Sequence, residues 1–379
     1  MEFSLSEEQE AIFDVAYSFG QENIAPFAIQ WENQGTIPKE LWSNISELGF
    51  GGIYVSEEYG GSGLSRLDAT LIFEALAMAC PSVGSFLSIH NMVGGMIDKF
   101  GSDKNKESFL PDLCSMKKIF SYCLTEPGSG SDASALKTKA TRTNEGFILN
   151  GTKSFISGGA YSNAYLTMTR TGEDGPKGIS AIIIEDPSDG LSFGAFEDKM
   201  GWRAQPTAQV QFDDCRVPSD NLIGDEGCGF TYAMAGLDGG RLNIAASALG
   251  GAQFALESSL TYMNERKAFG KNLNQFQALQ FKLADMEVKL QTARTFLRHA
   301  AWKLDTQADD ASKFCAMAKL YVTDVSFEVA NEALQLHGGY GYLADYGIEK
   351  IVRDLRVHQI LEGTNEIMRL IISRQMLLE

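Results

Sequence analysis

The carboxylate best suited to act as a base lies in the C-terminal run Gln359-Ile-Leu-Glu-Gly-Thr-Asn-Glu366. Glu362 follows an apolar pair and precedes Gly363. A carboxyl group in apolar surroundings has a raised pKa and can remove a proton near neutral pH. Thr364 can cap a helix that starts after it, and the N-terminus of that helix could face a phosphate. An ordinary surface glutamate fits the same pattern, so the residues alone leave both interpretations open.

A glycine- and serine-rich run is the second candidate, Tyr122-Cys-Leu-Thr-Glu-Pro-Gly-Ser-Gly-Ser-Asp132. Its backbone N–H groups and the hydroxyls of Thr125, Ser129 and Ser131 could bind a polar ligand, and the apolar strand beside them would suit a flat ring. The alternative is a plain loop between domains. The run from Gly128 superficially matches the dinucleotide fingerprint G-x-G-x-x-A, but the chain continues as strand rather than opening a helix. We therefore reject that interpretation.

Three more runs carry cations or glycines that could approach a ligand. Leu237-Asp-Gly-Gly-Arg241 is expected to start a helix, where Arg241 offers a cation to a phosphate or is simply a surface arginine. Arg266, near a helix end, could bind a pyrophosphate or only interact with the helix dipole. In Gln335-Leu-His-Gly-Gly-Tyr-Gly341 the glycine pair predicts a helix stop, and His337 is expected to be structural.

The hydrophobic period divides the chain into three segments that must position these residues. The first is helical, with a capping box at Ser6 and Gln9, Pro38 expected at a first helical position and Gly49 as a stop. From about residue 120 to 224 the period is two, and Asn150-Gly151 predicts a two-residue hairpin in a small antiparallel sandwich or barrel. The other predicted strands are Ala164–Arg170, Ile179–Glu185 and Val210–Phe212.

After about residue 230 the helical period returns. A regular three-four spacing from Phe276 to Leu304 predicts one long helix with a bundle seam. Other helices are expected over Arg241–Glu265, Ala311–Leu336 and Asn365–Leu378. The fold class predicted is mainly α with a central β domain, divided into an all-α domain over residues 1–119, a β domain over 120–228 and a four-helix bundle over 229–379.

Composition excludes several classes of function. The 379 residues carry 32 Lys and Arg against 49 Asp and Glu, a formal net charge of −17. This negative net charge repels the phosphates of a nucleic acid, and it also argues against binding to an anionic membrane surface. No stretch of about 20 apolar residues suggests a membrane span. The six cysteines form no C-x-x-C motif and no H-E-x-x-H motif occurs, so no metal site is expected. The start Met1-Glu2-Phe3-Ser4 resembles neither a secretory signal nor a transit peptide, which indicates a cytoplasmic chain or a processed mitochondrial-matrix chain.

Taken together, these segments resemble the acyl-CoA dehydrogenase family over essentially the whole chain. The run from Tyr122 to Asp132 is similar to its first signature, and Gln335 to Gly341 with Glu362-Gly-Thr364 is similar to its second. The resemblance implies an N-terminal helical domain, a middle β domain and a C-terminal four-helix bundle. It also implies FAD, a homotetramer arranged as a dimer of dimers, an acyl-CoA substrate, and electron-transfer flavoprotein as the electron acceptor.

The resemblance also assigns residues, carried over by position. Along the flavin it implies Tyr122, Leu124, Thr125, Ser131, Phe155, Ile156 and Ser157. Phe155 and Ser157 replace the Trp and Thr that the family often has, and they keep the ring and the hydroxyl. Around the pyrophosphate and adenosine, partly across a subunit interface, it implies Arg266, Phe276, Gln277, Gln335, Gly338, Gly339, Thr364 and Glu366. At the CoA thioester it implies Ser131, Asp238, Gly239, Gly240, Arg241 and Arg374.

Glu362 is the catalytic residue that the resemblance implies. It would remove the α-proton of the acyl thioester while the β-hydride passes to the flavin. Isovaleryl- and long-chain-type relatives carry their base at the position of Gly240, which here has no side chain. The substrate that the resemblance favours is isobutyryl-CoA, with 2-methylbutyryl-CoA and butyryl-CoA close behind it. The volume of the acyl pocket is expected to depend on residues such as Ile89, Met92 and Leu361. An acyl-CoA oxidase and a flavin-free scaffold are two further hypotheses for the function of the chain.

Overall fold

The computed structural model describes residues 4–378; the first three residues, on which part of the localisation prediction rests, and Glu379 lie outside this range. The chain begins with helices α1 to α6, which span Glu7–Asn23, Ala28–Gln34, Lys39–Glu47, Arg66–Ala79, Pro81–Phe100 and Asp103–Cys114. Serine starts three of these helices with a capping box, at Ser6, Ser65 and Ser102. The predicted box at Ser6 and Gln9 is thereby confirmed.

Two details at the ends of α3 test the predictions made there. Gly49, just past the helix, has φ +77° and confirms the expected stop. Pro38 is the N-cap, with φ −65° and ψ 142°, and the first helical residue is Lys39. The prediction for Pro38 was therefore wrong by one position, since its ψ angle lies in the extended region.

A mixed sheet follows the helices. Its strands β1 to β8 span Phe120–Cys123, Lys139–Arg142, Gly146–Ser157, Ala164–Arg170, Ile179–Glu185, Leu191–Phe193, Thr207–Pro218 and Leu222–Ile223. Their order is β6-β7-β3-β2-β4-β5-β8, and β1 pairs with β4. The expectation of a purely antiparallel unit was wrong, because β1 and β2 both run parallel to β4. The predicted strands β4 and β5 are confirmed at both ends.

The predicted hairpin at Asn150-Gly151 does not form. Strand β3 continues straight through it and pairs with β2 on one side and β7 on the other. Gly151 instead lies at a register shift against β7, with φ +148°. The turn between β2 and β3 lies seven residues earlier, where the N–H of Thr143 donates to the carbonyl of Gly146.

Long helices form the C-terminal part. Helices α7 to α11 span Gly229–Glu265, Gln277–Asp305, Ala311–His337, Ile348–Arg356 and Asn365–Leu378, and a short ribbon of β9 (Lys267–Ala268) and β10 (Lys271–Asn272) joins α7 to α8. The predicted seam of α8 is buried at Met286, Leu290, Ala293, Leu297 and Ala300. Helix α7 begins 12 residues before the predicted start at Arg241. The expectation that the run from Leu237 opens a helix was therefore wrong, and no helix N-terminus lies beside Asp238.

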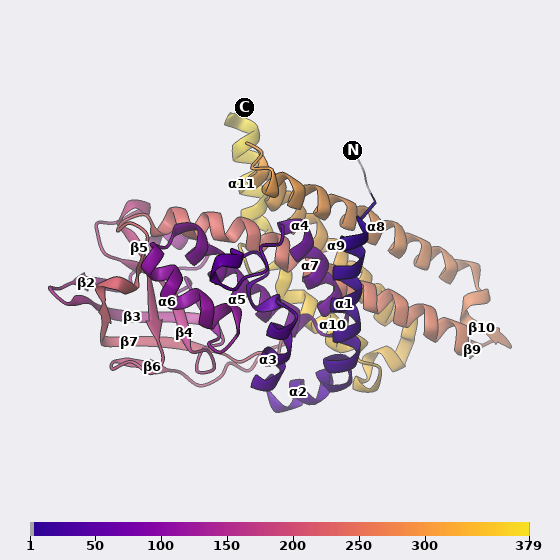
Figure 1. Ribbon diagram of the computed structural model, residues 1–379. Coiled ribbons are helices and arrows are strands. Elements are labelled where there is room, and N and C mark those ends of the chain that lie inside the picture. Colours follow the sequence, from indigo (N-terminus) through magenta and orange to yellow (C-terminus); the bar gives the residue numbers. More distant parts are fainter. Residues whose placement is uncertain (1–3, 379) are drawn as a thin grey trace.

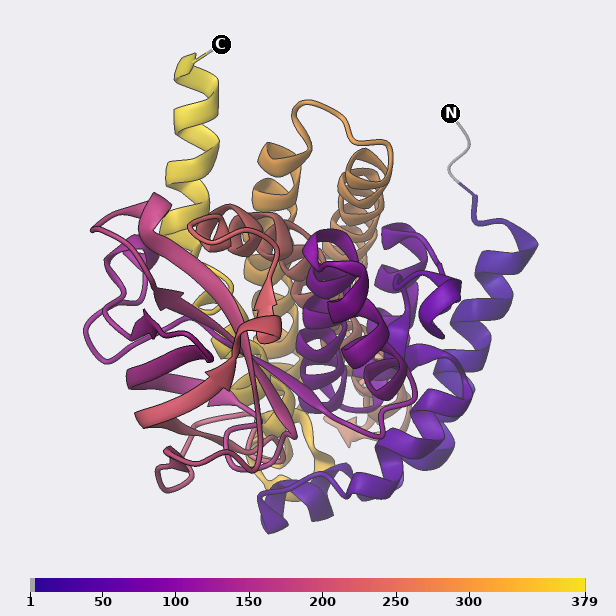
Figure 2. The ribbon, with the colours of Figure 1, turned by 60° about the vertical axis from the view of Figure 1, so that its left-hand side comes forward.

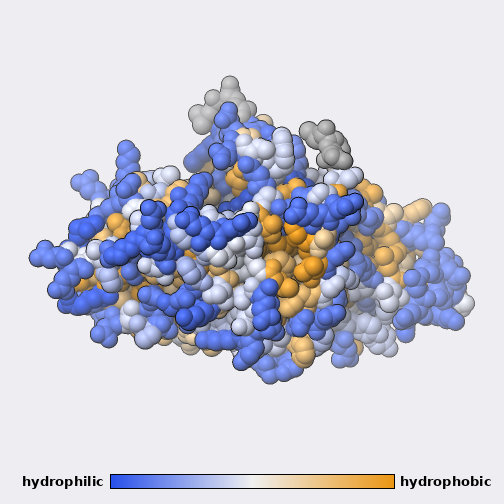
Figure 3. All heavy atoms as spheres, in the orientation of Figure 1, coloured by the Kyte–Doolittle hydropathy of each residue, from blue (hydrophilic) through white to orange (hydrophobic). Residues whose placement is uncertain are grey.

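Ten short 3-10 turns connect these elements: Ala25–Phe27, Phe50–Gly52, Glu57–Tyr59, Ala133–Ala135, Pro176–Gly178, Ser219–Asn221, Leu273–Gln275, Gly338–Tyr342, Ala344–Tyr346 and Val357–Gln359, within residues 4–378. In Figure 1 the strands gather at the left, and the end of α7 and the start of α8 extend to the right, towards β9 and β10. Figure 2 shows α11, in yellow, standing out from the rest of the molecule. Apolar side chains gather right of centre in Figure 3, over the region in which Figure 1 places α4 and α7.

Two buried histidines join the three parts of the molecule. His90 on α5 lies between the carbonyl of Leu113 and the N–H of Phe120, at 3.0 Å from each. His358 lies 3.1 Å from the carbonyl of Ile244 on α7 and accepts the indole N–H of Trp202 at 3.3 Å. Within the described residues, no helix is long and apolar enough to cross a membrane, and no group of three potential metal ligands occurs.

Candidate active site

The loop that carries Glu362 runs from the end of the 3-10 turn at Gln359 to the start of α11. Glu362 has φ +56° and Gly363 has φ +86°, so two consecutive residues are left-handed. For a residue with a Cβ this conformation costs about 1 kcal/mol or more. Thr364 Oγ1 accepts the N–H of Ile367 at 3.3 Å, which confirms the predicted helix cap. The loop therefore holds its glutamate in an unfavourable backbone conformation between two ordered elements.

The Glu362 carboxylate points into the protein against α7 and α5. Its Oε2 atom is buried and has no hydrogen-bond partner. A Cβ atom built on Gly240 would lie 2.7 Å from Oε2 and 2.9 Å from the sulfur of Met92. Burial raises the pKa of Glu362 to about 7, although the charges of Arg241 and Lys319 oppose this change. A carboxyl group with that pKa can take up and release protons near neutral pH.

Arg241 does not face solvent. Its side chain is 5% exposed, and Nη1 donates to Asp238 Oδ1 at 2.5 Å. Asp238 also accepts a hydrogen bond from Ser312 Oγ at 3.0 Å. The expected helix start and the alternative of a surface arginine were both wrong, because Arg241 is buried inside α7. Its Nε atom is buried without a hydrogen-bond partner, and a contact with a phosphate stays a prediction. The charge of Arg241 acts on Glu362, where it lowers the pKa.

Tyr122 faces the same interior from β1. Its hydroxyl is buried and has no hydrogen-bond partner. Burial raises the pKa of Tyr122 above its ordinary value, and the nearby Glu362 carboxylate raises it further. Two unpartnered polar atoms in one buried region, Tyr122 Oη and Glu362 Oε2, are expected where a ligand normally supplies the partner.

The ends of β1 and β3 form one wall. The N–H of Ser154 donates to the carbonyl of Thr125 at 2.9 Å, and Lys153 Nζ donates to the carbonyl of Leu124 at 2.9 Å. Ile156 is buried, whereas Phe155 is 68% exposed at a left-handed φ of +58°. The structure thus brings together the predicted flavin residues Leu124, Thr125, Phe155, Ile156 and Ser157. Ser131 lies further along the same loop and is exposed.

A small cavity of about 350 Å³ opens under the glycine- and serine-rich loop. Glu126 and Ser129 lie in its wall and exchange backbone hydrogen bonds of 2.9 and 3.1 Å. A Cβ atom built on Gly128 or Gly130 would meet nothing within 4 Å. This tight turn therefore leaves open space next to its glycines.

A larger cavity of about 630 Å³ lies at the other end of the helical part. Its wall includes four residues predicted for the pyrophosphate and adenosine, namely Arg266, Gln335, Gly338 and Gly339. It also contains residues that the sequence analysis did not single out: Tyr262, Leu273, Leu279, Lys282, Leu336, Tyr340 and Leu343. Tyr262 precedes Arg266 by one helical turn. That spacing in the sequence could have predicted that both residues face the same cavity.

The remaining predicted residues lie outside this cavity wall. Phe276 caps α8 and Gln277 is its first residue. Thr364, Glu366 and Arg374 belong to α11 or its cap, and both Glu366 and Arg374 are exposed. Within the single chain, the structure therefore does not bring the α11 residues together with Arg266 and Gln335.

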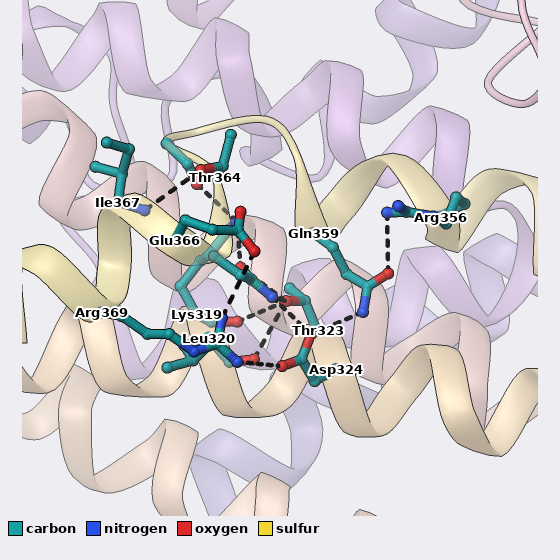
Figure 4. Close-up of polar contacts among 12 residues, drawn as sticks. Lys319, Leu320, Thr323, Asp324, Arg356, Gln359, Thr364, Glu366, Ile367 and Arg369 are labelled. Carbon is teal, nitrogen blue, oxygen red and sulfur yellow. Dashed lines mark hydrogen bonds and ion pairs between the residues drawn. The ribbon is translucent and has the colours of Figure 1, made fainter. Parts of the chain in front are cut away.

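Lys319 is a residue of this region that the sequence analysis missed. It lies on α9, is fully buried, and donates to the carbonyl of Gly363 and to Asn365 Oδ1, at 2.8 Å each (Figure 4). Burial lowers the pKa of Lys319 to about 7. The sequence signal that could have singled out Lys319 is its place among the buried apolar positions of α9, such as Cys315, Ala318 and Val322.

Comparisons with known proteins identify the family. The acyl-CoA dehydrogenase N-terminal, middle and C-terminal domain models match residues 6–117, 121–215 and 227–377. The isobutyryl-CoA dehydrogenase of Dictyostelium discoideum is 54% identical over 98% of this chain and 90% of its own. The mitochondrial isobutyryl-CoA dehydrogenase of Bos taurus is 50% identical over 99% of this chain and 90% of its own. The chain belongs to the acyl-CoA dehydrogenase family, and it is an oxidoreductase.

Solved structures agree in fold. The butyryl-CoA dehydrogenase of Megasphaera elsdenii superposes with a TM-score of 0.96 at 38% identity, over 100% of both chains. A chain from the structure of the electron transferring flavoprotein of Acidaminococcus fermentans has a TM-score of 0.97 at 40% identity, over 100% of both chains. PigA with FAD and proline has a TM-score of 0.95 at 31% identity, over 99% of both chains. These matches confirm the predicted fold class of two helical domains around a β domain.

Proposed function

We propose that this protein is an FAD-dependent dehydrogenase that oxidises isobutyryl-CoA, a short branched-chain acyl-CoA, to the corresponding 2-enoyl-CoA. The observation that carries the proposal is the buried, unpartnered Oε2 atom of Glu362 beside Gly240, in a carboxyl group whose pKa is raised to about 7. The names of the two relatives at 54% and 50% identity support isobutyryl-CoA as the substrate.

The residues present fit FAD. The buried hydroxyl of Tyr122 lacks a partner, and the ends of β1 and β3 form a wall with an exposed aromatic ring at Phe155. At the other end, Gly338 and Gly339 leave open space in a cavity that also holds the cation of Arg266. We propose that the first region holds the flavin ring and the second part of the adenosine and pyrophosphate. When bound, FAD supplies an acceptor for the hydride that leaves the β-carbon.

The chemistry of the chain itself centres on one proton. Glu362 Oε2 takes the proton from the α-carbon of the thioester, and Gly240, which has no side chain, leaves the room that this carboxylate occupies. The charge of Arg241 keeps part of the Glu362 population ionised, which the base requires. We propose that Ser131, Asp238, Arg241 and Arg374 contact the CoA thioester and that Gly239 and Gly240 line the acyl site.

We further propose electron-transfer flavoprotein as the acceptor and a homotetramer as the assembly. The structural match to a chain from an electron transferring flavoprotein structure supports the first. Exposed apolar side chains on α8, such as Phe281 and Val288, and at the end of α11, such as Leu377, support the second, since such surface is commonly covered by a neighbouring subunit. The domain boundaries at about residues 120 and 228 and the compartment remain predictions.

The decisive variant is Glu362→Gln. It keeps the size of the side chain and removes the base, so we expect unchanged FAD content and ligand binding with a loss of flavin reduction of about 10³-fold. Stopped-flow absorbance of the flavin with isobutyryl-CoA measures that rate. Glu145→Gln, at an exposed turn, is the matched control. Full activity of Glu362→Gln would overturn the assignment of the base.

The substrate is tested by steady-state turnover with straight and branched acyl-CoAs from C4 to C8. We expect the highest kcat/KM with isobutyryl-CoA, followed by 2-methylbutyryl-CoA and butyryl-CoA. A preference for a straight C8 chain would contradict the branched-chain assignment and leave the dehydrogenase assignment in place. Slow reoxidation of the substrate-reduced enzyme by air separates a dehydrogenase from an oxidase, and a colourless purified protein would indicate a flavin-free scaffold.

A further inference from the structure

We propose that Lys319 is a positioning residue for Glu362: it fixes the backbone of the Glu362 loop from behind and places a positive charge that favours the ionised carboxylate. This inference rests on the proposed function, because it takes Glu362 to be the base. Lys319 is not a catalytic residue in this account, since it touches the loop rather than the substrate.

The first support is the anchor on the backbone. Nζ of Lys319 donates to the carbonyl of Gly363 at 2.8 Å, and Gly363 is the residue that directly follows Glu362. Both Glu362 and Gly363 are left-handed, so a return of Glu362 to a right-handed conformation would turn the Gly363 carbonyl away from Nζ. The hydrogen bond therefore opposes the relaxation that would withdraw the carboxylate from Gly240.

The second support is that Lys319 is itself fixed. Its other acceptor, Asn365 Oδ1, belongs to the first residue of α11, and the Asn365 amide donates to Thr323 and to Asp324 at 3.1 and 2.7 Å. Gln359, which precedes the loop, also donates to Asp324 at 2.7 Å. Figure 4 shows these side chains converging from α9, α11 and the segment before the loop. Both ends of the loop are thus tied to one stretch of α9.

The third support is charge. Glu362 is close enough to Lys319 for each to favour the charged form of the other. The other charged or titratable groups that act on this pair are Arg241 on α7, Tyr122 on β1, Asp324 on α9 itself, His358 before the loop and Glu366 on α11. Arg241 donates to Asp238 on its own helix, whereas Lys319 also donates to the backbone of the Glu362 loop.

The test variants are Lys319→Met, which has similar length and no charge, and Lys319→Gln, which keeps an N–H donor without charge. Two uncharged variants are made because a buried lysine is often needed for folding. The measurement is made on whichever retains cooperative unfolding and bound FAD. Lys117→Met, at a lysine whose side chain is 76% exposed, is the matched control.

The first readout is the rate of flavin reduction by isobutyryl-CoA as a function of pH. Lys319 is charged below its own pKa of about 7, so removing this cation raises the pKa of Glu362 above about 7. We expect the acid limb of the profile to move up by about one pH unit, with a rate about fivefold lower at pH 7. The second readout does not depend on turnover. Calorimetry of a non-reactive S-alkyl-CoA thioether, in two buffers of different ionisation enthalpy, gives the protons taken up on binding. We expect the pH of maximal uptake to move by the same amount.

A variant that lowers the rate equally at every pH, with the acid limb and the proton uptake unchanged, overturns the proposal, because that is the result of a purely structural role. The parallel Glu362→Gln measurement separates this failure from a failure of the proposed function. If Glu362→Gln still reduces the flavin, the base itself is wrong. If Glu362→Gln is inactive and the Lys319 variants keep the wild-type acid limb, only the inference about Lys319 fails.

Discussion

Glu362 combines a left-handed backbone, a buried oxygen without a partner and a pKa raised to about 7. A base must be ionised to act, so we expect flavin reduction to follow an acid limb with a midpoint near pH 7 and a plateau above it. Single-turnover rates between pH 5.5 and 9 measure this profile. A rate that stays constant down to pH 5.5 would show that the carboxyl group has an ordinary pKa, and hence that it is not desolvated as described.

Gly240 provides a second prediction at the scale of one residue. Because an added Cβ would lie 2.7 Å from Glu362 Oε2, Gly240→Ala must displace the carboxylate or the Met92 side chain. We expect a fall of about tenfold or more in the rate of flavin reduction, with FAD content retained. Gly194→Ala is the control, since an added Cβ there would meet no atom closer than Gln209 Cβ at 3.3 Å, against 2.7 Å at Gly240. Equal rates for wild type and Gly240→Ala would contradict the close approach.

A buried ion pair supports the wall formed by β1 and β3. Lys153 is fully buried and contacts Glu126 at 2.8 Å, and Glu126 also accepts the N–H groups of Lys137 and Thr138 at 2.7 and 2.9 Å. We expect Lys153→Met to destabilise the protein by about 3 kcal/mol, because it leaves a buried carboxylate without its cation. Thermal melting measures the effect. Adding Glu126→Gln should recover part of the loss; a double variant no more stable than Lys153→Met would contradict this account.

The elements that the sequence predicted correctly are those with an uninterrupted period. The seam of α8 and strands β4 and β5 are examples, since burial on one face or on both leaves a regular pattern. Asn150-Gly151 misled because a glycine that accommodates a bulge inside a long paired strand looks identical to a hairpin turn. The start of α7 was missed because Gly236, Gly239 and Gly240 lower helix propensity there. These residues are glycines because of tertiary packing: Met96, Arg66 and Glu362 occupy the space that their Cβ atoms would need.

In the candidate site, too, the sequence indicated residues that belong to local motifs and missed those whose role depends on tertiary contacts. The motifs predicted Glu362 and the wall at Leu124 and Thr125, because the resemblance carries residues over by position. Lys319 was beyond reach, since its role depends on α9 and the start of α11 meeting in space. The pairing of Arg241 with Asp238 was missed for a related reason. The helix start was misplaced, so a buried side chain was interpreted as an exposed one.

The whole molecule depends on two neutral imidazoles between its parts. His90 and His358 each accept one N–H and lie beside one carbonyl, and burial lowers the pKa of both to about 4. Protonation would remove the acceptor for Phe120 or Trp202. The unfolded chain binds these protons below about pH 6.5 and the folded chain only near pH 4, so stability falls as the pH drops through that window.

We expect each imidazole to contribute up to about 3 kcal/mol to this loss. The melting temperature should therefore fall steadily as the pH drops from 7 to 5. We expect the helix and sheet signals to be lost together, because the contacts of both His90 and His358 weaken. Circular dichroism at wavelengths for each kind of structure measures this. A melting temperature that is constant from pH 7 to pH 5 would contradict the assignment of two neutral buried histidines.

The packing of α4 on α7 has a consequence for the synthesis of the chain. Helix α4 is buried over most of its length, and the backbones lie so close that a Cβ on Gly250 would meet the carbonyl of Glu74 at 2.1 Å. Helix α7 begins 150 residues after the end of α4, and a ribosome adds about 5–20 residues per second. The apolar surface of α4 thus waits roughly ten seconds or more for its partner. During that interval the nascent N-terminal helices present a surface that chaperones recognise, and fragments that end before α7 should aggregate.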